Sequence, residues 1–183
     1  AEQAGLEFQF RVVNLRGAHP NTALLELTGQ AGVRRIPIQE FYIKAGKVDI
    51  HPDEIQTAIL ISKESYENTF GHYIKYAMRN AMDIATLGTS VNVRLSADKK
   101  YVKRARVAFG VAGAIPLRAV TAERLAEGQP ISEELAERFS QAVKEDINPR
   151  DSWRASRDFR LHIAVESAKR AFMESVKLAG GAL

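Results

Sequence analysis

The chain has 183 residues, of which 45% are hydrophobic and 26% are charged. This composition is typical of a globular protein and excludes an intrinsically disordered chain. The absence of cysteine excludes disulfides, thiolate metal sites, cysteine-ligated iron–sulfur clusters and a cysteine nucleophile within this chain. The net charge is +4 and the pI about 9.4, but acidic residues are interleaved with the basic ones, so we do not expect nucleic-acid binding.

No apolar run approaches the length of about 20 residues that crosses a bilayer, so we expect no membrane span. The N-terminal residues have neither an uninterrupted apolar core nor a small-residue cleavage pattern, so we expect no secretory signal. We predict a cytoplasmic location, with which the absence of cysteine is compatible. The four histidines include no pair at i,i+4, and we do not expect a zinc site.

Residues 6–61 are predicted to be rich in β-strands. The segments "LEFQFRVV" and "ALLEL" alternate apolar and polar side chains, and "VRRIPI" is a third short candidate. Pro37 and Pro52 interrupt this region, and "AGK" at 45–47 is typical of a turn. The segment "DEIQTAILIS" at 53–62 predicts a further strand that leads out of the region.

Beyond Gly71 the pattern changes to two strong strands followed by helices. The strands "SVNVRL" and "VKRARVAFGVA" are separated by "SADKK", which predicts a hairpin loop. Thr121 is the expected N-cap of "AERLAEG", which Gly128 ends. Ser132 is the expected N-cap of "EELAERFSQAVKED". The buried face of that helix is predicted to carry Leu135, Phe139 and Val143.

A final helix is predicted over residues 155–179, with Gly180 and Gly181 as its end. Its apolar stripe is expected to consist of Leu161, Val165, Ala168, Phe172 and Val176. Strands that precede helices, instead of alternating with them, predict an α+β fold with the helices against one face of the sheet.

The stretch "KYAMRNAMDIATLGTSVNVRL" contains the most informative pattern, because Lys75, Arg79 and Asp83 lie four residues apart among small and apolar side chains. If the segment is helical, these residues form an ion-pair ladder on a solvated face. Alternatively, the small residues let a flat apolar ligand approach the backbone. The cations would then meet its phosphates or a partner's carboxylates, while Ile84 packs on a ring and Asp83 anchors the loop.

A second cluster, "NPRDSWRASRDFRLHI", places four arginines around the only tryptophan, Trp153. Asn148-Pro149 ends the preceding helix, and Ser152 or Ser156 can cap the next one. We favour a helix entry in which Trp153 fills the core and the arginines pair with carboxylates. The alternative is an anion-binding or subunit-docking patch, because tryptophan and arginine are enriched at interfaces.

Motifs for catalysis and phosphate binding are missing from the sequence. There is no dinucleotide-binding glycine fingerprint between a strand and a helix, no P-loop and no G-x-S-x-G elbow. Asp83 and Asp146 have no evident carboxylate partner, and His72 is predicted to be a residue on a strand face. We therefore predict no catalytic residue and no metal ligand in this chain.

The motif "YIKYAMRNAMDIATLG", with its Met-Asp-Ile-Ala leading into a strand, resembles the flavoprotein subunit of molybdenum hydroxylases, the family of xanthine dehydrogenase and carbon monoxide dehydrogenase. The resemblance continues in "RRIPIQEFYIKAGKVDIHPDEI", "RARVAFGVAGAIPLRA" and "INPRDSWRASRDFRLHIA", and covers about residues 23–181. It is strongest to bacterial xanthine dehydrogenase FAD-binding subunits and the carbon monoxide dehydrogenase medium subunit.

The resemblance implies a flavoprotein C-terminal domain over 63–183, with a three-stranded antiparallel sheet packed by helices, preceded over 1–62 by a β-rich remnant of the FAD-binding domain. Electrons would pass from the molybdenum cofactor and iron–sulfur clusters of partner subunits through FAD to NAD or another acceptor. By the same match, four residues would lie at the cofactor, namely Lys75, Arg79, Asp83 and Ile84.

The family's FAD-binding half also carries two glycine-rich loops around the pyrophosphate, and neither occurs in this sequence. We therefore expect the chain to correspond to the C-terminal portion of such a subunit and to bind FAD weakly or not at all by itself. The alternative function is a non-enzymatic assembly domain that has kept a subunit-docking surface and lost FAD binding.

Overall fold

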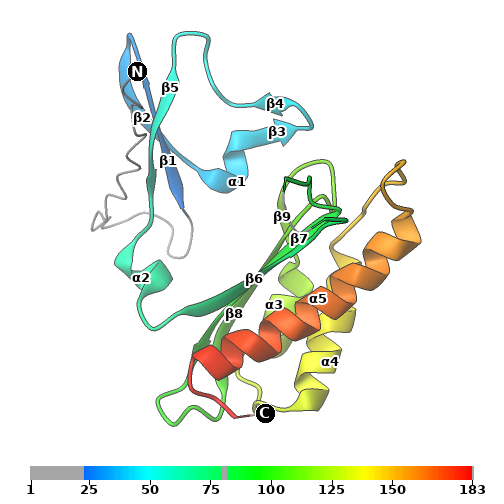
Figure 1. Cartoon of the computed structure of the whole chain (residues 1–183). Helices are drawn as coiled ribbons and strands as arrows, with labels where there is room; N and C mark the ends of the chain where they lie inside the picture. The colour runs from blue at the N-terminus through cyan, green and yellow to red at the C-terminus, as the bar shows by residue number, and fades with distance from the viewer. Residues whose placement is uncertain (1–22, 80–81, 183) are drawn as a thin grey trace, which may run out of the picture. The chain divides into compact units, whose positions relative to one another are not determined.

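In the computed structural model the described residues are 23–79 and 82–182 (Figure 1). They form two units, one ending at Glu67 and one beginning at Asn68. The boundary expected from the sequence was five residues earlier, between 62 and 63. The short helix α2 (Lys63–Tyr66) therefore belongs to the first unit.

The first unit contains a three-stranded antiparallel sheet in the order β2-β1-β5. Its strands are β1 (Leu24–Gly29), β2 (Gly32–Pro37) and β5 (Ile55–Leu60), which confirms three of the predicted strands. The candidate strand "LEFQFRVV" lies outside the described residues. A one-turn helix, α1 (Ile38–Phe41), leads into a ribbon of β3 (Tyr42–Lys44) and β4 (Lys47–Val48). The predicted turn is confirmed there, since Gly46 has φ +71°.

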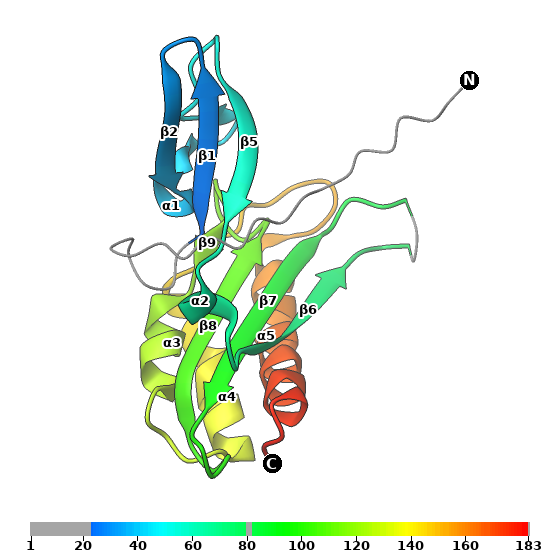
Figure 2. The ribbon, with the colours of Figure 1, turned by 90° about the vertical axis from the view of Figure 1, so that its left-hand side faces the viewer.

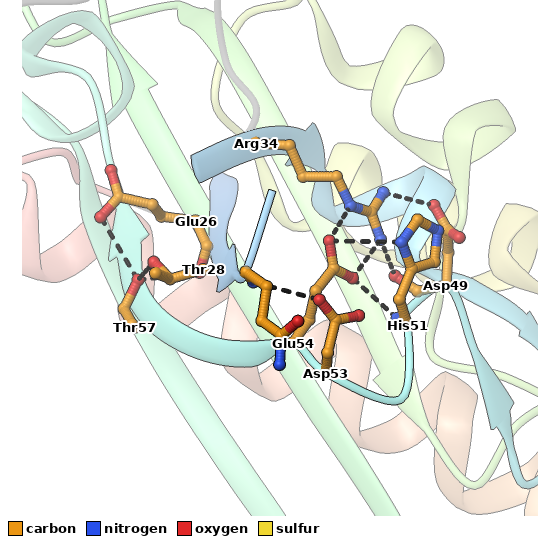
Figure 3. Close-up of polar contacts among 9 residues, drawn as sticks. Glu26, Thr28, Arg34, Asp49, His51, Asp53, Glu54 and Thr57 are labelled. Atoms are coloured by element: carbon orange, nitrogen blue, oxygen red, sulfur yellow. Dashed lines mark hydrogen bonds and ion pairs between the residues drawn. The ribbon is translucent and has the colours of Figure 1, made fainter. Parts of the chain in front are cut away.

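Alternation along β1 buries Leu25 and Leu27, which pack with Phe41 in a small core. The turn before β5 is held by a polar cluster around Arg34 on β2 (Figure 3). The Arg34 Nε and Nη2 atoms donate to the two Glu54 carboxylate oxygens at 2.6 and 2.9 Å, and Nη1 donates to Asp49 at 2.9 Å. Glu54 also accepts a hydrogen bond from the His51 backbone N–H at 2.7 Å. Hydrogen bonds from Arg34, then from His51, lower the pKa of Glu54 to about 2.

The second unit contains an antiparallel sheet in the order β6-β7-β8-β9. Its three long strands are β6 (Phe70–Tyr76), β7 (Leu87–Leu95) and β8 (Val102–Gly110). The predicted β7–β8 hairpin is confirmed by the antiparallel pairing of the two strands. The predicted α+β class with a three-stranded sheet is also confirmed, and β9 (Leu117–Arg118) adds a two-residue edge strand.

The helices of the second unit cover one face of this sheet (Figure 2). They are α3 (Val120–Ala126), α4 (Glu133–Ala142) with the 3₁₀ turn η1 (Val143–Glu145), and α5 (Arg157–Leu178). Helix α5 packs on β6 and β7, α3 packs on β8, and α4 packs on α3 and α5. The alternation in "SVNVRL" places Val91, Val93 and Leu95 in the core beneath the helices.

Two of the predicted helix starts are confirmed. The Ser132 Oγ atom accepts a hydrogen bond from Leu135 N at 3.0 Å, and the Ser156 Oγ atom accepts one from Phe159 N at 3.2 Å. The prediction for Thr121 was wrong, because the N-cap of α3 is Ala119. Thr121 lies inside the first turn, and its backbone N–H donates to Asp146 at 2.7 Å. The carboxylate of a distant residue therefore replaces the local cap.

The predicted core faces of α4 and α5 are largely confirmed. Leu135, Phe139 and Val143 are buried, as are Ala168, Phe172 and Val176, whereas Leu161 and Val165 are partly buried. Two serines on the same side of α5 fix the helix against β7. The Ser167 hydroxyl contacts the Thr89 hydroxyl at 2.7 Å, and the Ser175 hydroxyl donates to Val91 O at 2.9 Å.

Candidate functional site

The predicted site lies at the connection between β6 and β7, of which residues 77–79 and 82–86 are described; we call these residues the β6–β7 loop. The helical interpretation of this segment is wrong. Lys75 lies in β6, and Met82 has a φ of +49°, which an α-helix does not contain. The Thr86 backbone N–H donates to Tyr76 O at 2.8 Å and closes the base of the loop.

Asp83 organises the loop from within. Its two carboxylate oxygens accept hydrogen bonds from the Arg79 and Ile84 backbone N–H groups, both at 2.9 Å. Burial acts to raise the pKa of Asp83, but hydrogen bonds from Arg79 and Met78, the Arg79 charge and the Ile84 N–H together lower it. The carboxylate is therefore ionised at neutral pH and holds both ends of the turn.

The two cations are also tied to the loop backbone. The Lys75 Nζ atom donates to Asp83 O at 2.6 Å, and the Arg79 Nη2 atom donates to Met82 O at 3.0 Å. An ammonium group carries three donor protons and a guanidinium five, so both groups keep donors for a ligand. The structure thus brings Arg79, Asp83 and Ile84 together on the loop, with Lys75 at the end of β6 bonded to it.

The loop exposes large apolar side chains beside these cations. Met78, Met82 and Ile84 are 72%, 95% and 63% exposed, respectively. Exposed apolar side chains gathered on one segment indicate a binding surface. Their combination with Lys75 and Arg79 suits a flat apolar ring that carries anionic substituents.

Residues 148–156, which we call the Trp153 loop, precede α5. The prediction that Trp153 fills the core was wrong, because its side chain is 86% exposed. The Arg154 guanidinium carbon lies 4.3 Å from the centre of the indole ring, a cation–π distance. The expected arginine–carboxylate pairs are represented by Arg157, whose Nη1 atom lies 4.0 Å from an Asp158 carboxylate oxygen, and its backbone N–H donates to Asp151 at 2.8 Å.

Arg160 is a residue whose importance the sequence analysis missed. It is 2% exposed and donates to oxygens of both the β6–β7 loop and the Trp153 loop. A signal was present, because Arg160 lies four residues before Ala164 and eight before Ala168, on the helix stripe that faces the core.

Within the described ranges 23–79 and 82–182, no group of three or more histidine, aspartate or glutamate side chains is arranged to hold a metal ion. Over the same residues, every helix is too short or too polar to cross a bilayer.

Residues 72–175 match the sequence profile of the CO dehydrogenase flavoprotein C-terminal domain. The chain belongs to this family. The matched range starts within β6 and ends within α5, so the four predicted site residues and Arg160 all lie inside the family domain.

A curated relative of this chain is longer than the chain itself. The xanthine dehydrogenase FAD-binding subunit of Escherichia coli O157:H7 is 40% identical over 161 residues, which make up 88% of this chain and 54% of the relative. The chain therefore spans about half the length of that subunit.

Solved structures share the fold at lower identity. Quinoline 2-oxidoreductase from Pseudomonas putida 86 superposes with a TM-score of 0.78 at 22% identity, over 87% of this chain and 54% of that one. Carbon monoxide dehydrogenase from Hydrogenophaga pseudoflava gives a TM-score of 0.76 at 23% identity, over 87% and 54% of the two chains. Both matches extend beyond the family domain at residues 72–175.

Proposed function

We propose that this chain is the flavin-adjacent domain of a xanthine dehydrogenase-like FAD subunit, and that its β6–β7 loop lies against the isoalloxazine ring of FAD. The observation that carries the proposal is the loop itself, in which exposed apolar side chains stand beside two cations on a turn held by Asp83. The identity to an FAD-binding subunit supports the choice of ligand.

Lys75 and the three predicted loop residues each have a separate role in this proposal. Ile84 packs on the ring, and Lys75 and Arg79 face anionic groups of the flavin or of a dinucleotide acceptor. Asp83 holds the loop in the shape that presents them, through its hydrogen bonds to Arg79 and Ile84. A positive potential beside the ring favours negative charge on it, which assists acceptance of electrons.

FAD, when bound, supplies the redox chemistry, and this chain supplies position and electrostatics. The proposal places the iron–sulfur clusters and the molybdenum cofactor in partner subunits, and NAD or another acceptor at the far end of electron transfer. A cytoplasmic location is part of it, since soluble dinucleotides are available there. The chain contributes no catalytic acid or base, and the isolated chain is expected to be inactive.

The residues fit one part of FAD better than another. The β6–β7 loop suits the ring, whereas a pyrophosphate needs several converging backbone N–H donors, which glycine-rich loops supply in dinucleotide sites. The sequence contains no such loop, and the chain spans about half of its relative. The pyrophosphate is therefore assigned to a part of the subunit that this sequence lacks, and the affinity of this chain for FAD is expected to be weak.

Titration with FAD tests the proposal, with flavin fluorescence as the measurement. Quenching that saturates in the micromolar range supports a ring-binding loop, and Lys75→Ala should abolish it. Lys177→Ala removes an exposed lysine at the far end of α5 and should leave the titration unchanged. Absence of quenching at saturating FAD contradicts ring binding by this chain.

A second function, assembly without cofactor binding, is favoured by the exposed Trp153 with Arg154 against its ring. Tryptophan and arginine are the residue types that most often dominate binding energy at protein interfaces. Copurification with an iron–sulfur or molybdenum subunit, lost in Trp153→Ala while FAD quenching is absent in the parent chain, supports this second function.

A further inference from the structure

Arg160 places a positive charge inside the second unit. It is the fourth residue of α5, and its side chain is buried against the end of the sheet. The Nε atom donates to Thr86 O at 3.3 Å, the Nη2 atom donates to Ser152 Oγ at 2.7 Å, and Nη1 donates to Arg150 O. The three acceptors are neutral oxygens, so converging dipoles solvate the guanidinium in place of water.

These acceptors come from two segments far apart in the sequence. Thr86 is the last residue of the β6–β7 loop, whereas Arg150 and Ser152 belong to the Trp153 loop. A guanidinium is planar and directs its donors outward in a fixed fork, so it can hold three separated oxygens at once. A lysine ammonium at the end of a flexible chain lacks this geometry.

The contacts around Arg160 hold its helix in place, so its side chain cannot move with one loop and keep its hydrogen bonds to the other. The Ser156 cap fixes the start of α5, and the Ser167 hydroxyl contact with Thr89 fixes the helix on β7. The rings of Tyr76 and Phe159 also meet edge to face at 5.9 Å between centroids, beside the same junction. Displacement of either loop must therefore break a buried, charge-assisted hydrogen bond or move the other loop.

We propose that Arg160 is a positioning residue that couples the β6–β7 loop to the Trp153 loop. The flavin-facing surface and the exposed tryptophan then respond to each other, so that an event at one loop changes the other. Naming the β6–β7 loop as the flavin side rests on the proposed function above, whereas the coupling itself is a property of the unliganded chain.

Amide hydrogen exchange measured residue by residue by NMR on the whole chain tests the coupling without flavin. Three amides report on the two loops, because Thr86 N–H is bonded to Tyr76 O, and the Ser152 and Ala155 N–H groups are each bonded to the other's carbonyl. In Arg160→Lys, all three should exchange faster by about tenfold or more, since buried hydrogen bonds to a charged group are lost on both sides. The amides of α4 should keep their rates.

Two further variants separate coupling from general stability. Ser152→Ala removes one acceptor in the Trp153 loop, so exchange should accelerate at positions 152 and 155 and, transmitted through Arg160, at Thr86 as well; a Thr86 amide as protected as in the parent chain would overturn the coupling. Arg170→Met removes a guanidinium from the exposed side of α5, where Arg170 pairs with Glu166, and should leave all three amides unchanged.

Acceleration in only one loop of Arg160→Lys would overturn the coupling, as would uniform acceleration that includes α4. Emission of Trp153, the only tryptophan in the sequence, provides a second readout, because it should change in Arg160→Lys and not in Arg170→Met. The FAD titration is independent of both measurements. Its failure removes the proposed function and leaves the coupling, and failure of the exchange pattern does the reverse.

Discussion

The Asp83 carboxylate accepts a hydrogen bond from the Arg79 backbone N–H at 2.9 Å, while their side chains stand 3.8 Å apart as an ion pair. The four-residue spacing of Arg79 and Asp83 suggests a helical ion pair, but in the structure the hydrogen bond between them closes a turn. The backbone hydrogen bond matters more than the ion pair. Together with the hydrogen bond from the Ile84 N–H, it fixes the loop conformation in which Ile84 is exposed.

Replacing Asp83 by Asn should loosen the β6–β7 loop. The asparagine amide is uncharged and has one accepting oxygen, whereas both backbone N–H groups need an acceptor. One of the two hydrogen bonds is therefore lost, because the NH₂ group faces an N–H donor. We expect FAD quenching to weaken by about tenfold, with unchanged far-UV circular dichroism. Asp98→Asn, in the β7–β8 hairpin loop, is the matched control, and an equal loss of quenching there would contradict the role of Asp83.

The same carboxylate predicts a pH dependence. The pKa of Asp83 is lower in the folded chain than its ordinary value of about 3.9, so its contribution to loop order is complete above that value. It is lost as the pH falls through the folded-state pKa. Exchange of the Ile84 amide, corrected for intrinsic pH dependence, should stay constant from neutral pH to about 4 and accelerate below it. Acceleration already at pH 6 would contradict this assignment.

In the first unit, Glu54 should control stability in acid. Its pKa is about 2 in the folded chain against about 4.3 unfolded, so the stabilisation is complete above the unfolded value and disappears between the two. Glu54→Gln should therefore lower the urea midpoint of this unit at neutral pH and flatten its decline in acid. Glu166→Gln, which breaks an exposed pair with Arg170, should keep the parent pH profile. Parallel profiles for the parent chain and Glu54→Gln would disprove the prediction.

Phe172→Ala should destabilise the second unit by about 3–5 kcal/mol, because it leaves a cavity in a packed core. The ring is fully buried, with its centroid 4.7 Å from that of Phe139. Leu178→Ala, at the exposed end of the same helix, should cost less than about 1 kcal/mol. Urea unfolding followed by circular dichroism measures both, and comparable losses would mean that the core does not centre on Phe172.

Trp153→Ala should change the free energy of unfolding by less than about 0.5 kcal/mol, because the indole is largely exposed. In the parent chain, the tryptophan emission should have the long wavelength of a hydrated indole and be quenched readily by iodide. The neighbouring Arg154 should strengthen quenching by this anion, so Arg154→Gln should reduce quenching by iodide more than by neutral acrylamide. Blue-shifted emission that resists both quenchers would show instead that Trp153 is buried in the core.

The sequence by itself determined the elements whose signals are local. The alternation of apolar and polar side chains along Val91–Leu95 identified which face of the strand lies in the core. Ser132 and Ser156 marked the starts of the helices that they cap. Motifs around Lys75–Ile84 and Asn148–Arg160 also indicated the family to which the chain belongs. These features depend on residues within one or two turns of each other, so the pattern and its structural cause lie in the same stretch.

Only the tertiary structure decided which of these side chains are buried and what they contact. Trp153 is exposed and Arg160 buried, the reverse of what hydrophobicity alone predicts, because Arg160 donates to the oxygens that converge from residues 86, 150 and 152. Likewise, the carboxylate of the distant Asp146, and not the Thr121 side chain, accepts a hydrogen bond at the start of α3. Burial and hydrogen bonding are settled between residues distant in sequence, which a local pattern does not record.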